Sequence, residues 1–269
     1  MAEKSILYDA TKCTACRGCQ VACKSWNERE AEKTTNRGTI ENPPDLSPQT
    51  WLKMEFREPP DNNGGVRWLF TRRACMHCTD AACVKVCPTG ALFYHPLGFV
   101  SYDRGKCSGC GYCSQFCPFN VPRLDTNRGS GLGRMDKCTL CTTQGLDRID
   151  NGYEPACVKT CPPKALVYGD RAQLMTTGKT KVQTLQAQGY SNANIYGEKE
   201  LGGLHVMYVL ADSPEVYGLP KDPKYPAVAT AWQDVIKPLG WAAVGLVGAG
   251  LILNVMVARA KLLREKEGK

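Results

Sequence analysis

Sixteen cysteines fall into four groups of four along the 269 residues, and none is left over. The groups are Cys13, Cys16, Cys19 and Cys23; Cys75, Cys78, Cys83 and Cys87; Cys107, Cys110, Cys113 and Cys117; and Cys138, Cys141, Cys157 and Cys161. Disulfides join distant segments of short secreted chains, whereas thiolates separated by two residues converge on a metal. Because gaps of two residues recur in every group, the sequence predicts metal centres and no disulfides.

Residues 107–118 read C-S-G-C-G-Y-C-S-Q-F-C-P, a C-x2-C-x2-C-x3-C-P spacing. In bacterial ferredoxins with this spacing, three thiolates bind one iron–sulfur cubane and the fourth binds another, so such motifs occur in pairs. We expect Gly109 and Gly111 to let the backbone approach the cluster. We also expect Cys117 to begin a helix, with Pro118 in its first turn.

The other three groups vary this spacing. Residues 13–23 keep it, but Lys24 replaces the proline, so the helix after Cys23 should begin less sharply. Residues 75–87 have a second gap of four. Residues 138–161, taken alone, are compatible with a zinc ribbon. Their end, C-P-P-K-A-L, repeats the earlier C-P-T-G-A-L, which indicates an internal duplication and favours iron–sulfur clusters.

Three further features carry weaker signals. His77 lies inside the second group, where a hydrogen bond that supports the loop is favoured over cluster tuning or proton relay. The glycine-rich residues 129–133 follow no strand, and G-K-T at 178–180 lacks the first glycine of a phosphate loop. We therefore expect no nucleotide site.

The formal net charge of +8 is compatible with a nucleic-acid partner, but it counts the cysteines as neutral. Sixteen thiolates and four cubane cores of about +2 each would add about −8, which brings the loaded protein close to neutrality. We therefore expect no nucleic acid. With no catalytic constellation in the sequence, the chain is expected to conduct electrons and to have no catalytic site of its own.

Alternation and turn signals predict strands at residues 6–9, 51–56, 66–70 and 205–210. The second and third should form a hairpin, because P-P-D-N-N-G-G lies between them. A helix is predicted over 170–188 with Asp170 as N-cap, although Gly178 weakens it. Residues 214–226, rich in proline and lysine, indicate a linker.

Residues 239–258 form an apolar run interrupted only by Asn254, which would be about 30 Å long as a helix and would fit a bilayer core. A buried helix of a soluble protein is the alternative. Four basic residues follow the run: Arg259, Lys261, Arg264 and Lys266. The C-terminus is therefore expected in the cytoplasm, with the cysteine-rich part on the extracytoplasmic (periplasmic) side.

Two pairs of residues fit such an anchor. Trp232 and Trp241 suit the membrane interface, and Gly245 with Ala249 suits close packing against a partner helix. The opening M-A-E-K-S-I-L-Y-D-A contains neither an apolar signal run nor a twin arginine.

The chain resembles the beta subunits of membrane-bound formate dehydrogenases of the nitrate-inducible type, within the electron-transfer subunits of molybdopterin oxidoreductases. The resemblance covers nearly the whole chain. It is carried by A-C-R-G-C-Q-V-A-C-K-S-W-N (15–27), N-P-P-D-L-S (42–47), C-M-H-C (75–78), G-C-G-Y-C (109–113), C-P-F-N-V-P-R-L (117–124), K-C-T-L-C (137–141), E-P-A-C-V-K-T-C-P (154–162), H-V-M-Y-V-L (205–210) and Y-G-L-P-K-D-P-K (217–224). The basic tail after residue 257 departs from the resemblance, because the tail of the family member compared is acidic and contains histidine.

The resemblance implies an α+β fold of two pseudo-twofold-related, bacterial-ferredoxin-like modules and one C-terminal transmembrane helix. The implied parts are an outer module at 1–33 and 125–212, an inserted hairpin and second module at 34–124, a linker at 213–236, the transmembrane helix at 237–259 and a basic cytoplasmic tail at 260–269.

It also implies four [4Fe–4S] clusters with nested pairing of the cysteine groups. The implied ligand sets are Cys13, Cys16, Cys19 and Cys161 (set 1); Cys75, Cys78, Cys83 and Cys117 (set 2); Cys87, Cys107, Cys110 and Cys113 (set 3); and Cys23, Cys138, Cys141 and Cys157 (set 4). Spacing alone would equally allow sequential pairing, because the gaps after Cys87 and Cys117 are similar.

Such subunits conduct electrons from a molybdenum or tungsten pterin catalytic subunit that oxidises formate to a membrane cytochrome b that reduces quinone. Export would follow the twin-arginine signal of the catalytic partner. The alternatives are the same electron conductor in a hydrogenase or another molybdopterin complex and, more remotely, a zinc-binding interaction module.

Overall fold

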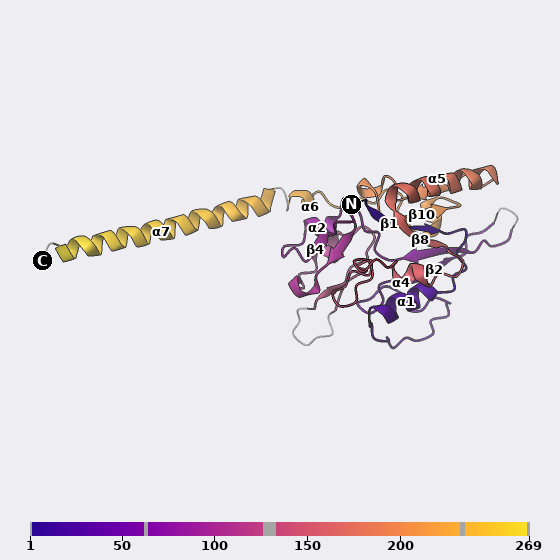
Figure 1. The fold of residues 1–269 in the computed structure, drawn as a ribbon, viewed down its shortest axis with the longest axis horizontal. Helices are drawn as coiled ribbons and strands as arrows, with labels where there is room; N and C mark the ends of the chain where they lie inside the picture. The colour runs from indigo at the N-terminus through magenta and orange to yellow at the C-terminus, as the bar shows by residue number, and fades with distance from the viewer. Residues whose placement is uncertain (1, 62–63, 126–132, 232–234, 268–269) are drawn as a thin grey trace. The chain divides into compact units, whose positions relative to one another are not determined.

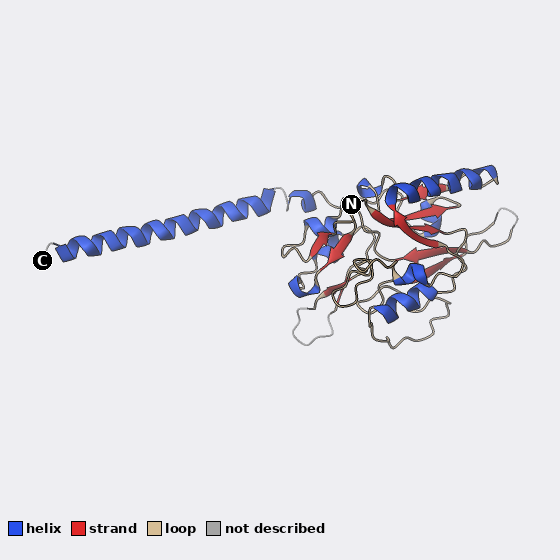
Figure 2. Cartoon of the chain, viewed as in Figure 1, coloured by secondary structure: helices blue, strands red, loops and turns tan. Residues whose placement is uncertain are grey.

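The computed structural model describes residues 2–61, 64–125, 133–231 and 235–267. The chain divides into two compact units, Met1–Tyr225 and Pro226–Lys269, and all sixteen cysteines lie in the first. Figure 1 names the helices and strands, and Figure 2 distinguishes helices from strands. The glycine-rich stretch at 129–133, except Gly133, lies outside the described residues, as does Trp232.

The larger sheet of the first unit has four strands in the order β8 (Leu166–Asp170), β1 (Lys4–Asp9), β10 (Val206–Leu210) and β9 (Asn194–Tyr196). β1 is parallel to β10 and antiparallel to β8, and β9 is antiparallel to β10. The strands predicted at 6–9 and 205–210 are confirmed. They pair with each other although they lie about 200 residues apart in sequence.

The two faces of this sheet have different roles because successive side chains of a strand point to opposite faces. On one face, Leu7, Met207 and Val209 pack with Leu174 and Leu185 of α5 (Arg171–Ala187). On the other face, strand residues pack with cysteines of the first and fourth groups, in one core that includes Ile6, Tyr8, Val206, Tyr208, Cys19, Cys23, Cys157 and Cys161. The sheet therefore has α5 on one face and these cysteines on the other; Figure 1 shows α5 alongside β1, β8 and β10.

Helix α5 confirms the helix predicted over 170–188, with two differences. Asp170 is the N-cap residue, but its side chain makes no capping hydrogen bond; it accepts one from Lys4 at 2.7 Å instead. Gly178, expected to weaken the helix, is buried against the sheet. A Cβ there would lie 2.5 Å from Cδ1 of Ile195, so the absence of a side chain lets the helix approach the sheet closely.

A second strand pair repeats the geometry of the pair formed by β8 and β1. In β4 (Leu92–Tyr94) and β5 (Val100–Tyr102), Leu92 lies opposite Tyr102, just as Leu166 of β8 lies opposite Tyr8 of β1. Each of these tyrosines lies five residues before the first cysteine of a C-x2-C-x2-C group.

The turns that follow the two tyrosines also match. The amide of Asp103 donates to the Ala91 carbonyl and that of Asp9 to the Ala165 carbonyl, both at 2.8 Å. Each aspartate side chain then accepts a hydrogen bond from the amide two residues later, Gly105 or Thr11. The chain therefore folds as two copies of one ferredoxin-like module.

Four short helices carry five of the cysteines: α1 (Gly18–Trp26), α2 (Ala82–Lys85), α3 (Tyr112–Phe116) and α4 (Ala156–Lys159). α1 packs against α4, and α2 packs against α3. α2 and α4 have the same sequence, A-C-V-K, and the residues after them have the same backbone angles, φ −87° and ψ −1°. The duplication indicated by the sequence is thus present in the structure.

The expectation that the fourth cysteine begins a helix is wrong. Cys117 lies at the C-terminal end of α3 with an extended backbone, φ −77° and ψ 113°, and Pro118 follows it. A proline disfavours the helical conformation of the residue before it, so the proline ends the helix. In the first group Lys24 takes its place, and α1 accordingly continues through Cys23 to Trp26.

The predicted hairpin is confirmed as β2 (Lys53–Arg57) paired with β3 (Leu69–Arg73), so the second strand begins three residues later than expected. A short pair, β6 (Arg123–Leu124) with β7 (Met135–Asp136), and three 3₁₀ turns complete the first unit. The turns are η1 (Arg104–Lys106), η2 (Glu200–Gly202) and η3 (Pro214–Tyr217).

The segment expected as a linker at 213–236 is divided between the two units at Pro226. Its first part is packed, because Tyr217 is buried and its carbonyl accepts a hydrogen bond from Thr71 at 2.8 Å. The second unit holds α6 (Val228–Ala231) and α7 (Lys237–Glu267). Within α7, residues 238–260 are long and apolar enough to cross a membrane, and their described side chains are almost all exposed.

Gly178→Ala should lower the unfolding temperature of the purified chain, because the clash with Ile195 costs about 1–3 kcal/mol, more than the about 1 kcal/mol gained in helix propensity. In an Ile195→Val background, which lacks Cδ1, the same alanine should become neutral or stabilising. Thr177→Ala, an exposed neighbour on α5, is the control and should change little. An equal loss in both backgrounds would contradict the close approach.

Candidate metal centres

The first two cysteines of each group enclose a tight turn of the same shape. The second residue between them has a left-handed backbone in all four groups, with φ of 52° at Ala15, 49° at His77, 76° at Gly109 and 55° at Leu140. In this conformation, backbone amides point toward sulfur: Ala15 N lies 3.4 Å from Cys13 Sγ, and Leu140 N lies 3.4 Å from Cys138 Sγ. Amides that face thiolate sulfur are part of iron–sulfur sites.

The members of set 4 line one cavity: Cys23 on α1, Cys138 and Cys141 in the fourth turn and Cys157 on α4. Apolar side chains, among them Ile6 and Trp51, close it. Burial and then the thiols of Cys138, Cys157 and Cys141 raise the pKa of Cys23.

Set 3 lines a second cavity, formed by Cys87, Cys107, Cys110 and Cys113. Leu92, Tyr102 and Met135 also line it. The cysteine that follows α2 is therefore brought to the turn that precedes α3, as in the nested arrangement.

In each of the other two sets, thiols of the same set raise the pKa of one cysteine, which indicates that the members of the set lie close together. Burial raises the pKa of Cys78 well above its usual range, and the thiols of Cys75, Cys83 and Cys117, the rest of set 2, raise it further. In set 1, burial raises the pKa of Cys13, and the thiols of Cys161 and Cys16 add to the rise.

Effects between sets join all four in one series. Cys157 of set 4 raises the pKa of Cys19 in set 1, and Cys138 of set 4 raises that of Cys75 in set 2. Cys113 of set 3 raises that of Cys83 in set 2. Packing agrees, because cysteines of sets 1 and 4, of sets 4 and 2, and of sets 2 and 3 occur in shared apolar clusters. The two cysteines that are exposed, Cys16 and Cys110, belong to the first and last sets of this series.

The arrangement suits clusters better than single ions. A zinc ion holds its thiolates about 2.3 Å away, so four of them gather tightly around one point. Among the described residues, no three or more His, Cys, Asp or Glu side chains are placed to hold one ion. All sixteen cysteines are free thiols in the structure, which agrees with the expected absence of disulfides.

Metal loading must displace protons from these thiols. Burial, the largest cause, raises the pKa of Cys19, Cys113 and Cys141 to about 12 each. These thiols are therefore protonated at neutral pH in the metal-free chain, and cluster assembly releases their protons. Lys137, which is buried and donates to the Val100 and Cys138 carbonyls, opposes this effect at Cys75 and Cys83.

His77 has the role predicted for it. The ring is buried, and its Nδ1 lies 2.9 Å from the Val100 carbonyl. Burial and then the charge of Lys137 lower its pKa, so the ring is neutral. It supports the second cysteine turn from inside the protein.

Sequence reasoning missed the tyrosines that precede two of the groups. Burial and then the nearby thiol of Cys13 raise the pKa of Tyr8, and Tyr102 stands in the same relation to Cys107. The signal was present in the sequence, because Y-D-x-x-K-C occurs at 8–13 and again at 102–107. No comparable sequence pattern pointed to Arg72 and Lys137, which are buried cations.

Comparisons with known proteins agree with this geometry. Two models described as 4Fe-4S dicluster domains match residues 12–91 and 66–171, and a model described as "Formate dehydrogenase N, transmembrane" matches residues 226–267.

Curated relatives align along most of the chain. It is 43% identical over 257 residues to the nitrate-inducible formate dehydrogenase iron-sulfur subunit of Escherichia coli K12, covering 94% of this chain and 84% of the relative. It is 42% identical over 247 residues to the formate dehydrogenase-O iron-sulfur subunit of the same strain, covering 90% and 79%. It is 35% identical over 243 residues to the hydrogenase-2 operon protein HybA of Escherichia coli O157:H7, covering 80% and 72%.

A duplicated ferredoxin-like fold around groups of cysteines, with matching 4Fe-4S domains, defines an iron–sulfur electron-transfer protein. The chain belongs to the family of formate dehydrogenase iron–sulfur subunits. It is accordingly a non-catalytic subunit of an oxidoreductase complex. The apolar run of α7 and the transmembrane match indicate that it is anchored in a membrane.

Ala15→Val should reduce the iron bound per chain after anaerobic reconstitution, because a β-branched residue in a left-handed turn costs about 1–3 kcal/mol. Ala15→Gly, which fits the same turn, should bind as much iron as the wild type. Thr14→Val, at the neighbouring exposed position, is the control. Equal iron in all three variants would show that the turn does not limit assembly.

Proposed function

We propose that the chain carries four [4Fe–4S] clusters and conducts electrons from a molybdenum or tungsten pterin subunit that oxidises formate to a membrane cytochrome b that reduces quinone. The observation that supports this proposal is the packing of the cysteines, in which members of sets 1 and 4, of sets 4 and 2, and of sets 2 and 3 are neighbours, while the two exposed cysteines belong to sets 1 and 3. A series of centres with two accessible ends suits passage of electrons across the subunit. Each [4Fe–4S] centre supplies one-electron redox chemistry.

Three observations support the nested ligand sets over sequential pairing. Two cavities are each lined by one complete nested set. α1 packs against α4 and α2 against α3, so that the first group meets the fourth and the second meets the third. The pKa of Cys13 is raised by Cys161, which sequential pairing would assign to another cluster.

The path of the chain supports a direction along the series. Tyr225, the last residue of the first unit, donates to Asp80 at 2.7 Å and accepts from Lys85 of α2 at 2.6 Å. The segment toward the membrane helix thus leaves the first unit beside α2, which holds Cys83 of set 2. We assign the membrane partner to the set 3 end and the catalytic subunit to the set 1 end.

The charge pattern supports an orientation in the membrane. Basic residues at 259, 261, 264 and 266 follow the apolar run directly. Such residues favour the cytoplasmic side, which assigns the cysteine-rich unit to the periplasmic side.

A second candidate function rests on the relative from a hydrogenase operon, which is 35% identical to this chain. Nothing in a chain of clusters recognises the substrate of the catalytic partner. The same subunit architecture would serve a hydrogenase or another molybdopterin complex.

Iron counting tests the number of clusters and their pairing. The reconstituted chain should hold about sixteen irons, four for each of four clusters. Cys13→Ala with Cys161→Ala removes two ligands of one proposed cluster, so about twelve irons should remain. Cys117→Ala with Cys138→Ala affects two clusters and should leave about eight. Sequential pairing would reverse these two results, because it places Cys117 and Cys138 in one cluster and Cys13 and Cys161 in two.

Purification of the intact complex in mild detergent tests the partners. A tag on this subunit should recover a pterin-binding large subunit and a haem-containing membrane subunit, with formate-dependent reduction of a dye. Recovery of a hydrogenase large subunit, or of a pterin subunit inactive on formate, would overturn the assignment to formate oxidation. It would leave the proposed electron-transfer role unchanged.

A further inference from the structure

Arg72 is a buried cation that forms no ion pair with a carboxylate among the described residues. It lies on β3, and the whole residue is 1% exposed. None of its three guanidinium nitrogens forms a hydrogen bond to the described residues. A buried charge without a partner costs several kcal/mol, so a compensating negative group is expected beside it.

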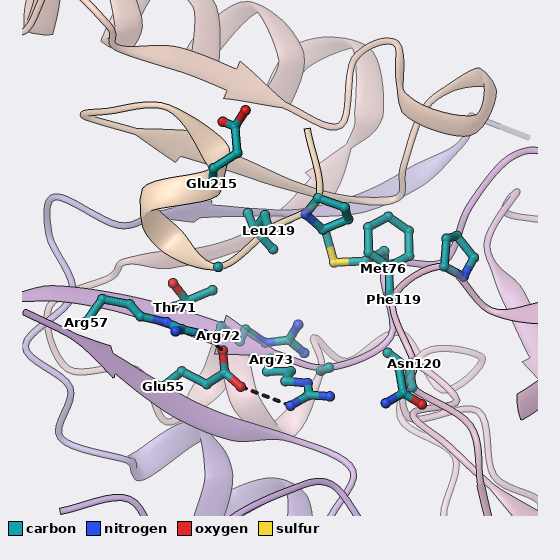
Figure 3. A pocket seen from close by; sticks show the side chains of 15 residues that line it. Glu55, Arg57, Thr71, Arg72, Arg73, Met76, Phe119, Asn120, Glu215 and Leu219 are labelled. Carbon is teal, nitrogen blue, oxygen red and sulfur yellow. Dashed lines mark hydrogen bonds and ion pairs between the residues drawn. The ribbon is translucent and has the colours of Figure 1, made fainter. Parts of the chain in front are cut away.

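Glu55, the carboxylate on the paired strand β2, already forms ion pairs with other arginines. Figure 3 shows Arg72 among the residues that line an open groove, together with Glu55, Arg57 and Arg73. Glu55 forms ion pairs with Arg73 at 3.1 Å and with Arg57 at 3.4 Å. Arg72 forms no ion pair with Glu55 or with any other carboxylate among the described residues.

The cysteine sets supply the missing negative charge. Arg72 lines a cavity together with Cys23, Cys138, Cys141 and Cys157, which are the whole of set 4. Arg72 also lies opposite Met54 in the paired strands β2 and β3, and the Met54 sulfur lies 3.7 Å from Cys19 Sγ of set 1. The guanidinium therefore lines the set 4 cavity and lies close to set 1.

We propose that the Arg72 guanidinium raises the reduction potentials of the two clusters held by sets 1 and 4. The inference rests on the ligand sets of the proposed function. Adding one electron to a cluster makes it more negative, and a nearby buried cation stabilises that reduced form more than the oxidised one. A guanidinium is always charged, so the effect does not vary with pH.

The clusters of sets 1 and 4, which would lie nearest the catalytic subunit, would both be affected by the charge of Arg72. Raised potentials there favour transfer of electrons out of the catalytic partner. The second buried cation, Lys137, acts on Cys75 and Cys83 of set 2, so the two cations influence different parts of the series.

The test is a redox titration of the detergent-purified complex, followed by electron paramagnetic resonance. Arg72→Gln and Arg72→Met remove the charge and keep a long side chain; either variant that assembles is sufficient. The reduction potentials of two of the four clusters should fall by about 59 mV or more. For a one-electron centre, this shift lowers the ratio of reduced to oxidised cluster at a fixed applied potential at least tenfold. Arg72→Lys should recover most of the shift.

Arg73→Gln is the matched control, because it removes a neighbouring arginine whose charge is already paired with Glu55 and Asp45. It should leave all four potentials unchanged. Unmoved potentials in the neutral Arg72 variants, or an equal fall in Arg72→Lys, would overturn the proposal.

The same titration separates failure of this inference from failure of the proposed function. Four cluster signals in the wild type with no shift on loss of Arg72 would reject the role of Arg72 alone. Fewer than four signals, or fewer than about sixteen irons per chain, would reject the cluster assignment itself.

Discussion

Convergence of thiolates from distant segments is the constraint on which the first unit depends. Helices α2 and α4 have four residues each, and three of the sheets have two strands. Helices and hairpins of this size are marginal by themselves in water. Cysteines from separate parts of the chain line common cavities, so iron–thiolate bonds would join elements that could not otherwise hold their positions.

The four-stranded sheet supplies the rigid side of this arrangement. It joins the N-terminal strand β1 to the late strand β10, and α5 covers the face opposite the cysteines. Among the described residues, the second copy of the module, around β4 and β5, has a two-stranded sheet and no such helix. The two copies are therefore unequal, because only the copy around β1 and β8 also includes α5, β9 and β10.

Charge balance links the fold to electron transfer. Burial raises the pKa of most of the buried cysteines, so the empty interior would favour neutral thiols. Two buried cations, Arg72 and Lys137, act in the opposite direction. Their cost is offset when negative clusters occupy the adjacent cavities. The same charges that compensate the clusters also stabilise their reduced states, so stability and redox potential share one physical origin.

The sequence by itself determined the class of the protein, the sixteen candidate ligands and the apolar anchor, because cysteine spacing and apolar runs are local patterns. Helix α5 and the strands β1 and β10 were likewise predictable from periodicity. The positions of the short helices were not, since Pro118 ends α3 where a helix was expected to begin. The benefit of Gly178 was not predictable either, because it depends on Ile195 in another element. Only the tertiary structure decided which cysteines share a cavity and which of them Arg72 lies beside. These are contacts between residues far apart in the chain, and local spacing carries no information about them.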